Sequence, residues 1–347
     1  MRILYCAALS RMLLGGLCVL QVWAANPPAL PKDMLEPVRA DLTMGRANDA
    51  VSRLRSLLTA NPENAIAHNL LCRVFYQEEQ WDEAIGECET AVNLAPLDSE
   101  YHLWLGRAYG EKARSIHSIK AYGLAKKVGR EFERAVELDN GNVEALSDLG
   151  EFYAAAPGIV GGGKGKAQDV ARALEKYDPA QAYQLQGFLA EKGKNYAQAE
   201  IEYRAEVEAS SQPAEAWMDL AAFYSRRRQW EQMLQAVRAG IDADQKAAKP
   251  YGPALVDGAT ILSSNNEEPR LAIQLLRLYL ASPNQSANAP VFQVHVQLSR
   301  LLEQQGDRTG AAQQIEAAAA LAREYHPAVP ATLEADEISI EKRTAKD

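Results

Sequence analysis

The chain has 347 residues, of which 47% are hydrophobic and 24% are charged, and its formal net charge is −9. This composition is ordinary for a folded chain. Its hydrophobic fraction is higher than that of a typical disordered chain. The acidic balance argues against nucleic acid and anionic membranes as ligands, because both require a basic surface.

Residues 1–24 have the pattern of a secretory signal peptide. They contain Arg2 and Arg11 but no acidic residue, and an apolar run follows from 12 to 20. Small or aliphatic residues stand at the two positions that a signal peptidase reads, so we expect cleavage after Ala24. The apolar run is shorter than the about 20 residues of a membrane span, so no membrane insertion is expected after cleavage; an uncleaved anchor is the alternative. The sequence thus predicts an exported protein, either periplasmic or secreted.

Cleavage would change the charge and the cysteine content of the chain. The mature chain would lose two positive charges, so its formal net charge would fall from −9 to −11. It would lose Cys6 and Cys18 and retain only Cys72 and Cys88. An oxidising compartment would permit this remaining pair to form a disulfide. The alternative is that both are small buried hydrophobic residues, which is how free cysteines usually behave.

A period of 34 residues becomes visible in the segment 65–98. His68 and His102 are 34 residues apart in the sequence, and so are Phe75 and Tyr109. The segment places small and large apolar residues at fixed offsets, namely Leu71, Cys72, Phe75, Ala84, Cys88, Ala91 and Pro96. The segment 214–247 fits the same pattern independently, through Trp217, Leu220, Ala221 and Tyr224.

These offsets match the tetratricopeptide pattern, Trp-x2-Leu-Gly-x2-Tyr followed by Ala-x3-Phe, Ala and Pro. In the segment 65–98, His68 replaces Trp and Cys88 replaces Phe. The chain therefore resembles the tetratricopeptide repeat family. This resemblance implies an all-α fold, an α-solenoid of about eight helix-turn-helix units forming a right-handed superhelix. A helix pair buries only one side of itself, so each unit must stack on its neighbours.

The register divides the chain into units of roughly equal length. They lie near 31–64, 65–98, 99–142, 143–179, 180–213, 214–247, 248–284 and 285–327. A charged tail, 331–347, follows as a polar cap helix or a frayed end.

Two units depart from the standard length. In the third unit the extra stretch 115–126 lacks Pro, and we expect a lengthened helical hairpin with a turn near Gly123. In the fourth unit Pro157 should end a helix, and the glycine-rich stretch Gly158–Gly165 should form a loop. This stretch matches Gly-x4-Gly-Lys, but Gly165 stands where Ser or Thr would bind magnesium and no strand precedes it. We therefore interpret it as a connection and not as a nucleotide site.

The sequence provides no motif for catalysis, metal or cofactor. His-Glu-x-x-His, Gly-x-Ser-x-Gly and Cys-x-x-Cys are all missing from it. His68 and His102 share the fourth position of adjacent units, but no further His or Cys joins them at ligand spacing, so no metal is predicted.

The family resemblance implies that a protein or peptide binds the concave surface formed by the first helix of each unit. The candidate groove residues are Asn69, Arg73, Tyr76, Arg107, Glu111, Phe188 and Arg226. Arg73 and Arg107 share the ninth position in adjacent units, so we expect them side by side, where paired guanidinium groups would suit a carboxylate. The alternative is that both arginines pair locally with Glu100, Glu111 or Glu144.

These observations favour an exported, non-catalytic scaffold without a cofactor, whose groove binds a peptide or extended protein segment in the assembly or maintenance of a bacterial envelope. One alternative is an enzyme or enzyme subunit with a pocket at Gly158–Gly165 and the 115–126 extension. Perturbed carboxylates beneath that loop would favour the enzyme, and an open groove lined by Arg73, Arg107 and Phe188 would favour the scaffold. Another alternative is a self-assembling structural protein, and the sequence does not decide the oligomeric state.

Overall fold

The computed structural model describes residues 32–116 and 120–328, and within these ranges all regular elements are helical. The expected signal peptide, 1–24, and the charged tail, 331–347, lie outside the described residues. The first half contains α1 (Lys32–Thr43), α2 (Ala47–Ala60), α3 (Ala65–Gln77), α4 (Trp81–Leu94), α5 (Ser99–Ser115), α6 (Lys120–Leu138), α7 (Val143–Ala155), the 3-10 helix η1 (Gly158–Val160) and α8 (Lys164–Leu174). The second half contains α9 (Pro179–Lys192), α10 (Tyr196–Ala209), α11 (Pro213–Arg226), α12 (Trp230–Lys246), α13 (Ala254–Ser264), α14 (Pro269–Ala281), α15 (Val291–Gln304), α16 (Arg308–Leu321) and the 3-10 helix η2 (His326–Ala328).

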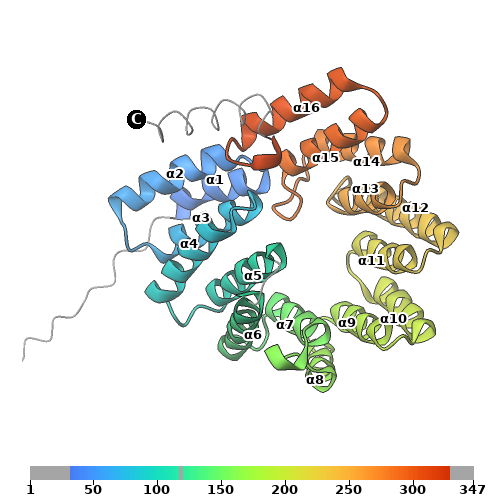
Figure 1. The fold of residues 1–347 in the computed structure, drawn as a ribbon, viewed down its shortest axis with the longest axis horizontal. Coiled ribbons are helices and arrows are strands. Elements are labelled where there is room, and N and C mark those ends of the chain that lie inside the picture. Colours follow the sequence, from blue (N-terminus) through green and yellow to red (C-terminus); the bar gives the residue numbers. More distant parts are fainter. Residues whose placement is uncertain (1–31, 117–119, 329–347) are drawn as a thin grey trace, which may run out of the picture.

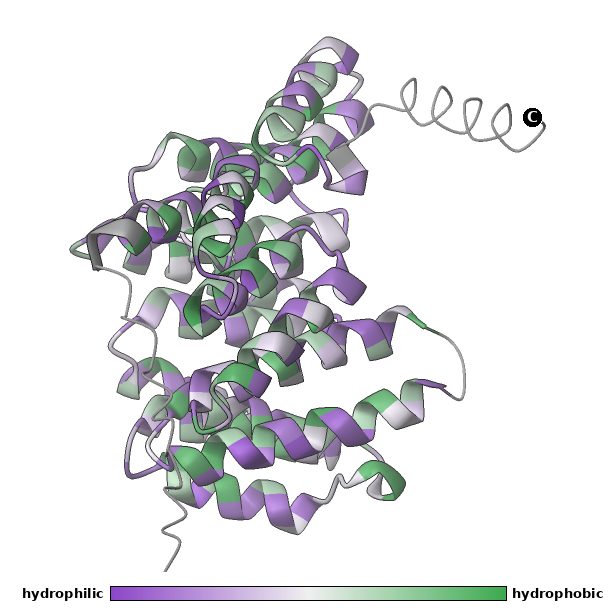
Figure 2. Cartoon of the chain, turned by 90° about the vertical axis from the view of Figure 1, so that its left-hand side faces the viewer, coloured by the Kyte–Doolittle hydropathy of each residue, from purple (hydrophilic) through white to green (hydrophobic). Residues whose placement is uncertain are grey.

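The helices form consecutive hairpins that stack side by side around a common centre (Figure 1). Odd-numbered helices face the centre, and even-numbered helices form the outer layer (Figure 1). Hydrophobic and hydrophilic residues occur on the same helices, as stacked amphipathic hairpins require (Figure 2). The prediction of an all-α solenoid of helical hairpins is therefore confirmed.

Short polar side chains fix where several inner helices begin. The side chain of Asn64 accepts a hydrogen bond from the Ala67 amide at the start of α3. Asp98, Asn142 and Asp178 cap α5, α7 and α9 in the same way. Because each cap satisfies amides that have no partner within the helix, the loops between units set the register of the repeat.

The small residue at the eighth position of a unit lets the two helices of that unit approach closely. A Cβ atom on Gly106 of α5 would lie 2.5 Å from the ring of Phe132 on α6. Substitution there would force the two helices apart, because buried side chains are close-packed and have no space to move into.

The extension in the third unit is helical, but its turn lies elsewhere than predicted. Helix α5 ends at Ser115 and α6 begins at Lys120, so Gly123 lies inside a helix and the expected turn near Gly123 is wrong. No other group lies within 4 Å of a Cβ at Gly123. A glycine at such a position costs only about 1 kcal/mol relative to Ala, and the contact of Leu124 with the core favours the helix.

The glycine-rich stretch folds back against the end of α7. The amide of Gly163 donates to the carbonyl of Tyr153 at 2.8 Å. A Cβ at Gly162 would lie 1.8 Å from the carbonyl oxygen of Ala156, so only glycine fits there. Val160, in η1, is buried. Residues 158–163 therefore form a compact connection between α7 and α8. Lys164 and Gly165, which we predicted to lie in the loop, belong instead to the first turn of α8.

The solenoid closes on itself, because the last hairpin packs against the first two (Figure 1). Gln77 of α3 donates to the carbonyl of Ala287 at 2.8 Å, and Gln293 of α15 donates back to the carbonyl of Gln77 at 2.7 Å. The side chain of Asn48 in α2 donates to the carbonyl of Ala320 and accepts from the amide of Arg323, each at 3.1 Å. The backbone and side chains of residues more than 200 positions apart thus form one seam.

The seam also has an apolar interior. Phe292 of α15 is 0% exposed, and its ring centroid lies 5.0 Å from that of Tyr325. Both belong to the buried cluster that contains Leu42 of α1 and Phe75 of α3. The Tyr325 hydroxyl donates to Glu79 at 3.1 Å. Each end of the solenoid therefore covers apolar surface of the other end.

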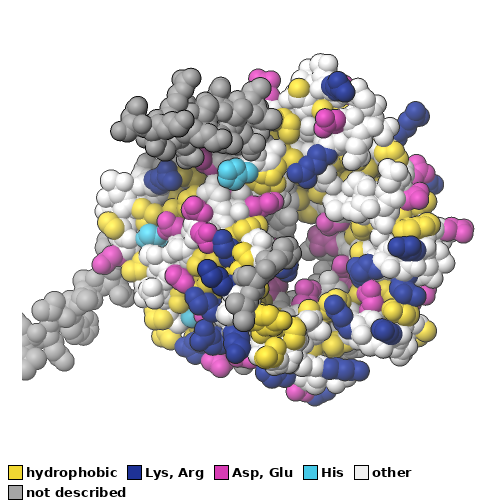
Figure 3. Space-filling model, viewed as in Figure 1, with side chains coloured by type: hydrophobic (Ala, Val, Ile, Leu, Met, Phe, Trp, Pro, Cys, Tyr) yellow, Lys and Arg dark blue, Asp and Glu magenta, His cyan; other side chains and the backbone are white. Residues whose placement is uncertain are grey.

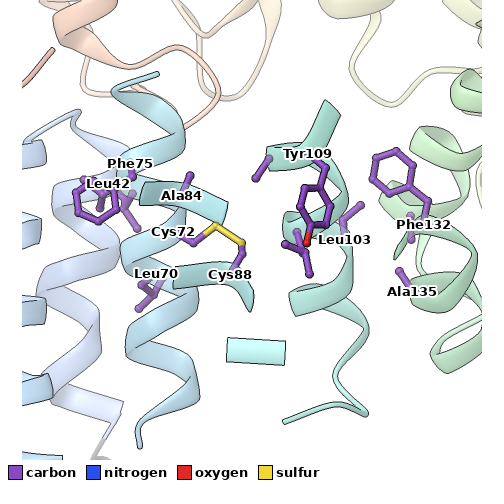
Figure 4. Packing of buried hydrophobic residues seen from close by; sticks show 14 of the residues in the cluster. Leu42, Leu70, Cys72, Phe75, Ala84, Cys88, Leu103, Tyr109, Phe132 and Ala135 are labelled. Carbon is purple, nitrogen blue, oxygen red and sulfur yellow. A yellow bond between two sulfur atoms is a disulfide. The ribbon is translucent and has the colours of Figure 1, made fainter. Parts of the chain in front are cut away.

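A disulfide joins the two helices of the second hairpin. Cys72 of α3 and Cys88 of α4 are bonded, with Cα atoms 5.3 Å apart, and both are fully buried (Figure 4). This Cα separation lies within the range that disulfides adopt.

Closure of the ring can be tested at Gly45, in the turn between α1 and α2. Gly45 has φ +62°, and a Cβ there would lie 2.6 Å from the backbone nitrogen of Val291. Gly306 is the matched control, with φ +84° and no group within 4 Å. We expect Gly306→Ala to lower the free energy of unfolding by about 1 kcal/mol through backbone strain alone, and Gly45→Ala to lower it by about 2 kcal/mol more. Small-angle scattering should show a larger radius of gyration for Gly45→Ala only; equal effects of the two substitutions would contradict the closure.

The disulfide can be tested by removing both of its sulfurs. The bond closes a loop with a sequence separation of 16. The double substitution Cys72→Ala and Cys88→Ala should lower the free energy of unfolding by about 3 kcal/mol, because the unfolded chain regains loop entropy. Urea unfolding measures this loss, and treatment of the native chain with a reductant should reproduce it. In the mature chain from Ala25, which retains only Cys72 and Cys88, two free thiols after oxidation and denaturation would show that the bond does not form.

Candidate functional site

The inner wall of the ring encloses a cavity of about 990 Å³. It is lined by α3, α5, α7, α9, α11 and the segment before α15, and the space-filling view shows an opening at its centre (Figure 3). Polar side chains predominate on this wall, among them Arg73, Gln77, Arg107, Glu144, Ser147, Asp148, Gln181 and Gln184. The concave surface of the repeat is thus an open, hydrophilic cavity.

The structure distributes the candidate groove residues over several parts of this wall. Arg73, Tyr76, Arg107 and Glu111 line the main cavity. Phe188 and Arg226 together line a smaller pocket beside it. Asn69 is only 2% exposed, so the structure places it in the packing between helices and away from the cavity surface.

Arg73 and Arg107 both lie over the indole ring of Trp104. Their guanidinium carbons are 4.6 Å and 4.8 Å from the centroid of the indole ring. Arg73 is paired with Glu100 at 2.9 Å, and Arg107 is paired with Asp148 at 2.6 Å and Glu144 at 3.0 Å. The two arginines are neighbours, as expected, but local carboxylates already neutralise both of them. A ligand carboxylate would have to compete with these pairs.

Tyr76 contacts two tryptophans in an aromatic cluster that lines the cavity. Its ring makes edge-to-face contacts with Trp81 and Trp104, each with a centroid distance of 5.5 Å. Its hydroxyl donates to Glu111 at 3.2 Å, and Glu111 also pairs with Arg114. Burial and the nearby Glu111 raise the pKa of Tyr76, so the phenol stays protonated and acts as a donor.

A pocket of about 560 Å³ lies between the glycine-rich stretch and the extended hairpin. Ala125, Pro157 and Val160 line it, and the aromatic rings of Phe132, Phe152 and Phe188 give it an apolar surface. It is the pocket that the enzyme interpretation requires. None of its lining residues, which all belong to the described part of the chain, is Ser, Thr, Cys, His or Lys.

Two carboxyl groups that line this pocket, those of Asp148 and Glu151, have raised pKa values. Loss of hydration, and then the charge of Asp148, raise the pKa of Glu151 to about 7. Loss of hydration also raises the pKa of Asp148, although its ion pair with Arg107 acts in the opposite direction. Perturbed carboxylates can mark a functional site, but Asp148 is held in an ion pair.

Five carboxylates form a second concentration of charge, on the opposite side of the ring. We call it the acidic wall: Asp178, Glu206, Glu215, Asp219 and Asp257. They line a cavity of about 490 Å³, and its lining residues include no Lys and no Arg. Acidic side chains at the edge of the central opening are visible in Figure 3. The sequence analysis missed this set, because its members come from three helices and one loop with no common spacing.

Glu206 is the most deeply buried member of the acidic wall. It is 3% exposed, and its Oε2 atom has no hydrogen-bond partner. Burial, and then the charge of Asp219, raise the pKa of Glu206 to about 10. Burial also raises the pKa of Asp219, which accepts a hydrogen bond from Gln184 at 3.1 Å. Glu206 therefore remains protonated at neutral pH.

His68 and His102 have the same structural role in adjacent units. Nδ1 of His102 lies 2.7 Å from Glu131, and its Nε2 lies 3.1 Å from the carbonyl of Pro96. His68 makes the corresponding bonds to Glu87 and to the carbonyl of Pro62. Each ring thus connects the two helices of its unit to the preceding loop. Among the described residues no group of three or more metal-ligating side chains is assembled.

Hairpins stacked around an inner surface define an α-helical repeat protein of the solenoid class. Residues 41–107 match the family model described as tetratricopeptide repeat. No curated protein matches the sequence.

Solved structures share the helical repeat at low sequence identity. The yeast Tom70 structure is 18% identical with a TM-score of 0.50, over 86% of this chain and 59% of that chain; the chain thus spans less than two thirds of Tom70. A thermophilic TPR protein from Thermus thermophilus is 16% identical with a TM-score of 0.47, over 58% of this chain and 98% of that one. A tetratricopeptide repeat protein from Parabacteroides merdae is 12% identical with a TM-score of 0.44, over 85% and 97%. The similarity to Tom70 concerns the fold.

No helix in the described part of the chain has the length and apolar character needed to cross a lipid bilayer.

The pKa of Glu206 leads to a prediction about stability. In the unfolded chain a glutamate has a pKa of about 4.3, below the value of about 10 in the folded chain. Glu206 therefore contributes stability fully below about pH 4 and loses it as the pH rises towards 10. Glu206→Gln keeps the shape and a donor without the charge, so it should raise the free energy of unfolding by about 2 kcal/mol more at pH 8 than at pH 5. Urea unfolding at the two pH values measures this difference.

The control for this experiment is Glu208→Gln, which changes an exposed glutamate on the same helix. It should alter the free energy of unfolding by less than about 0.5 kcal/mol at either pH. A gain from Glu206→Gln that is equal at both pH values would show that Glu206 is not protonated in the folded chain.

Proposed function

We propose that this chain is an exported, non-catalytic scaffold that binds an extended protein segment within its ring, in the assembly or maintenance of a bacterial envelope. The observation that carries the proposal is the cavity of about 990 Å³ on the concave surface of a tetratricopeptide-like repeat. A cavity that runs along five inner helices and the segment before α15 suits an elongated ligand better than a compact metabolite.

The wall of the cavity has groups that suit a peptide. Gln77 lines part of the cavity, and its side-chain amide nitrogen donates to the carbonyls of Leu42 and Ala287. Ser147, Gln181 and Gln184 add amide and hydroxyl groups. The pocket lined by Phe132, Phe152 and Phe188 can take an apolar side chain of the same ligand.

Export is supported by two features of the chain. The basic and apolar pattern of residues 1–24 is that of a signal peptide. The bond between Cys72 and Cys88 suits an oxidising compartment, because disulfides are rare in the cytosol. Both features favour a periplasmic or secreted protein.

The enzyme alternative has one observation in its favour, which is the raised pKa of Glu151 beside the glycine-rich stretch. Acid–base chemistry there would depend on carboxylates alone, because the lining residues provide no nucleophilic hydroxyl, thiol, imidazole or amine other than the Tyr76 phenol. The burial and hydrogen bond of Tyr76 keep that phenol protonated. The geometry therefore favours binding over catalysis.

The proposal is tested with peptides selected from a random library, displayed on phage, on the mature chain from Ala25. Phe188→Ser should weaken the selected peptides about tenfold or more, because Phe188 is half-buried and lines two pockets of the inner wall. The control is Ile201→Ser, since Ile201 is 59% exposed on the outer helix α10. Fluorescence anisotropy measures the affinities. Peptides that bind both variants as tightly as the native chain would place the binding surface outside the ring.

A further inference from the structure

The charge of this acidic chain is unevenly distributed along the sequence, and two stretches are basic. Residues 112–130 contain six Lys or Arg and no Asp or Glu, and residues 152–168 contain two Lys and no acidic residue. The whole chain, by contrast, has a formal net charge of −9. The overall acidic balance therefore does not exclude an anionic partner for a surface that these two stretches form.

The fold brings the two basic stretches together. Helix α6 packs against η1, and Ala125 of α6 lines the same pocket as Val160 of η1. Lys166 of α8 lies 3.7 Å from Glu133 of α6 and donates to the carbonyl of Gly161 at 3.2 Å. The start of α6 and the hydrophobic η1 segment project from the same side of the molecule (Figure 2). The two stretches thus contribute to one surface at the edge of the ring.

Three basic side chains on this surface are exposed and have no acidic partner. Lys126 and Arg130 are one helical turn apart on α6, and Lys164 is in the first turn of α8. Among the described residues, none of these three forms an ion pair. Figure 3 shows Lys and Arg side chains over α6 and over α8, with a hydrophobic patch between them. Their charge is therefore available to an anionic surface.

Large hydrophobic side chains are exposed beside these charges. Ile159 of η1 is 73% exposed, although the neighbouring Val160 is buried. Tyr122 of α6 is 52% exposed and lies one helical turn from Lys126. A soluble anion would need only the basic groups. Exposed apolar side chains next to basic ones instead suit a lipid surface, where the apolar groups enter the interface and the ammonium groups stay among the phosphates.

We propose that these five residues form a surface that attaches the protein peripherally to an anionic phospholipid bilayer. We call this surface the basic rim: Tyr122, Lys126, Arg130, Ile159 and Lys164. None of the five lines the central cavity, the pocket beside the glycine-rich stretch or the acidic wall. The inference therefore goes beyond the proposed function, because the inner wall stays free for a protein segment while the basic rim contacts lipid.

An exposed apolar side chain elsewhere on the ring lacks this charge pattern. Ile201 of α10 is 59% exposed, but its neighbours in the sequence are Glu200 and Glu202. An anionic surface would repel these carboxylates. Ile201 is therefore a matched control for Ile159, with the same side chain and similar exposure but the opposite charge around it.

The test is cosedimentation of the mature chain from Ala25 with lipid vesicles. We expect binding to vesicles of phosphatidylglycerol and phosphatidylcholine in equal parts, and no binding to vesicles of phosphatidylcholine alone. The triple variant Lys126→Gln, Arg130→Gln, Lys164→Gln should lower the partition coefficient for the anionic vesicles about tenfold or more, because each basic residue near such a surface adds attraction. Ile159→Ser should lower it about fivefold, because the inserted apolar side chain is lost.

Two control variants are matched to these changes. Arg270→Gln, Arg277→Gln and Arg308→Gln remove three exposed positive charges from α14 and α16, across the ring from α6 and α8 (Figure 1). This variant and Ile201→Ser should both keep the partition coefficient within about twofold of the native value, since charges farther away than a Debye length are screened.

Three results would overturn the inference. Equal binding to the vesicles without phosphatidylglycerol would show that negative lipid charge is not recognised. Equal weakening by the two triple variants would show that the location of the basic residues does not matter. A loss of binding in the basic-rim triple variant without any effect of Ile159→Ser would indicate a site for soluble anions and not for a bilayer.

Discussion

An α-helical hairpin has two faces to cover, and this requirement determines the shape of the whole molecule. Within the solenoid each hairpin covers the next, but the first and last hairpins each have one face without a neighbour. Here the two end faces cover each other, through Phe292 and Tyr325 against the cluster of Leu42 and Phe75. The free energy of burying apolar surface thus drives the closure of the ring.

Closure changes the electrostatics of the inner wall. A concave surface that faces open solvent keeps its carboxylates hydrated, whereas an enclosed one removes part of their hydration. Glu151, Glu206 and Asp257 all have a raised pKa for this reason, with neighbouring carboxylates as the second cause. Burial of these carboxyl groups therefore favours their protonated, neutral form, and a rise in pH that ionises them costs stability. On the opposite side of the inner wall, Arg73 and Arg107 form ion pairs with Glu100 and Asp148.

The sequence predicted the parts of this structure that repeat. Spacings of 34 residues between Phe75 and Tyr109, or His68 and His102, reflect the same local packing in each unit, so a pattern could reveal them. The prediction failed at Gly123, where helix formation over 120–138 overcame the local signal for a turn. It left two alternatives for Cys72 and Cys88, because spacing alone does not determine how closely two facing helices approach.

The sequence by itself determined that the chain forms helical hairpins that stack, because these depend on contacts between residues at most one repeat apart. Only the tertiary structure decided that the ends meet and that Glu206, Asp219 and Asp257 share one cavity. Gln77 and Ala287 are separated by 210 residues, and their contact depends on the small rotation between hairpins summed over the whole chain. No local pattern encodes that sum, so the closed ring and its acidic wall appear only in three dimensions.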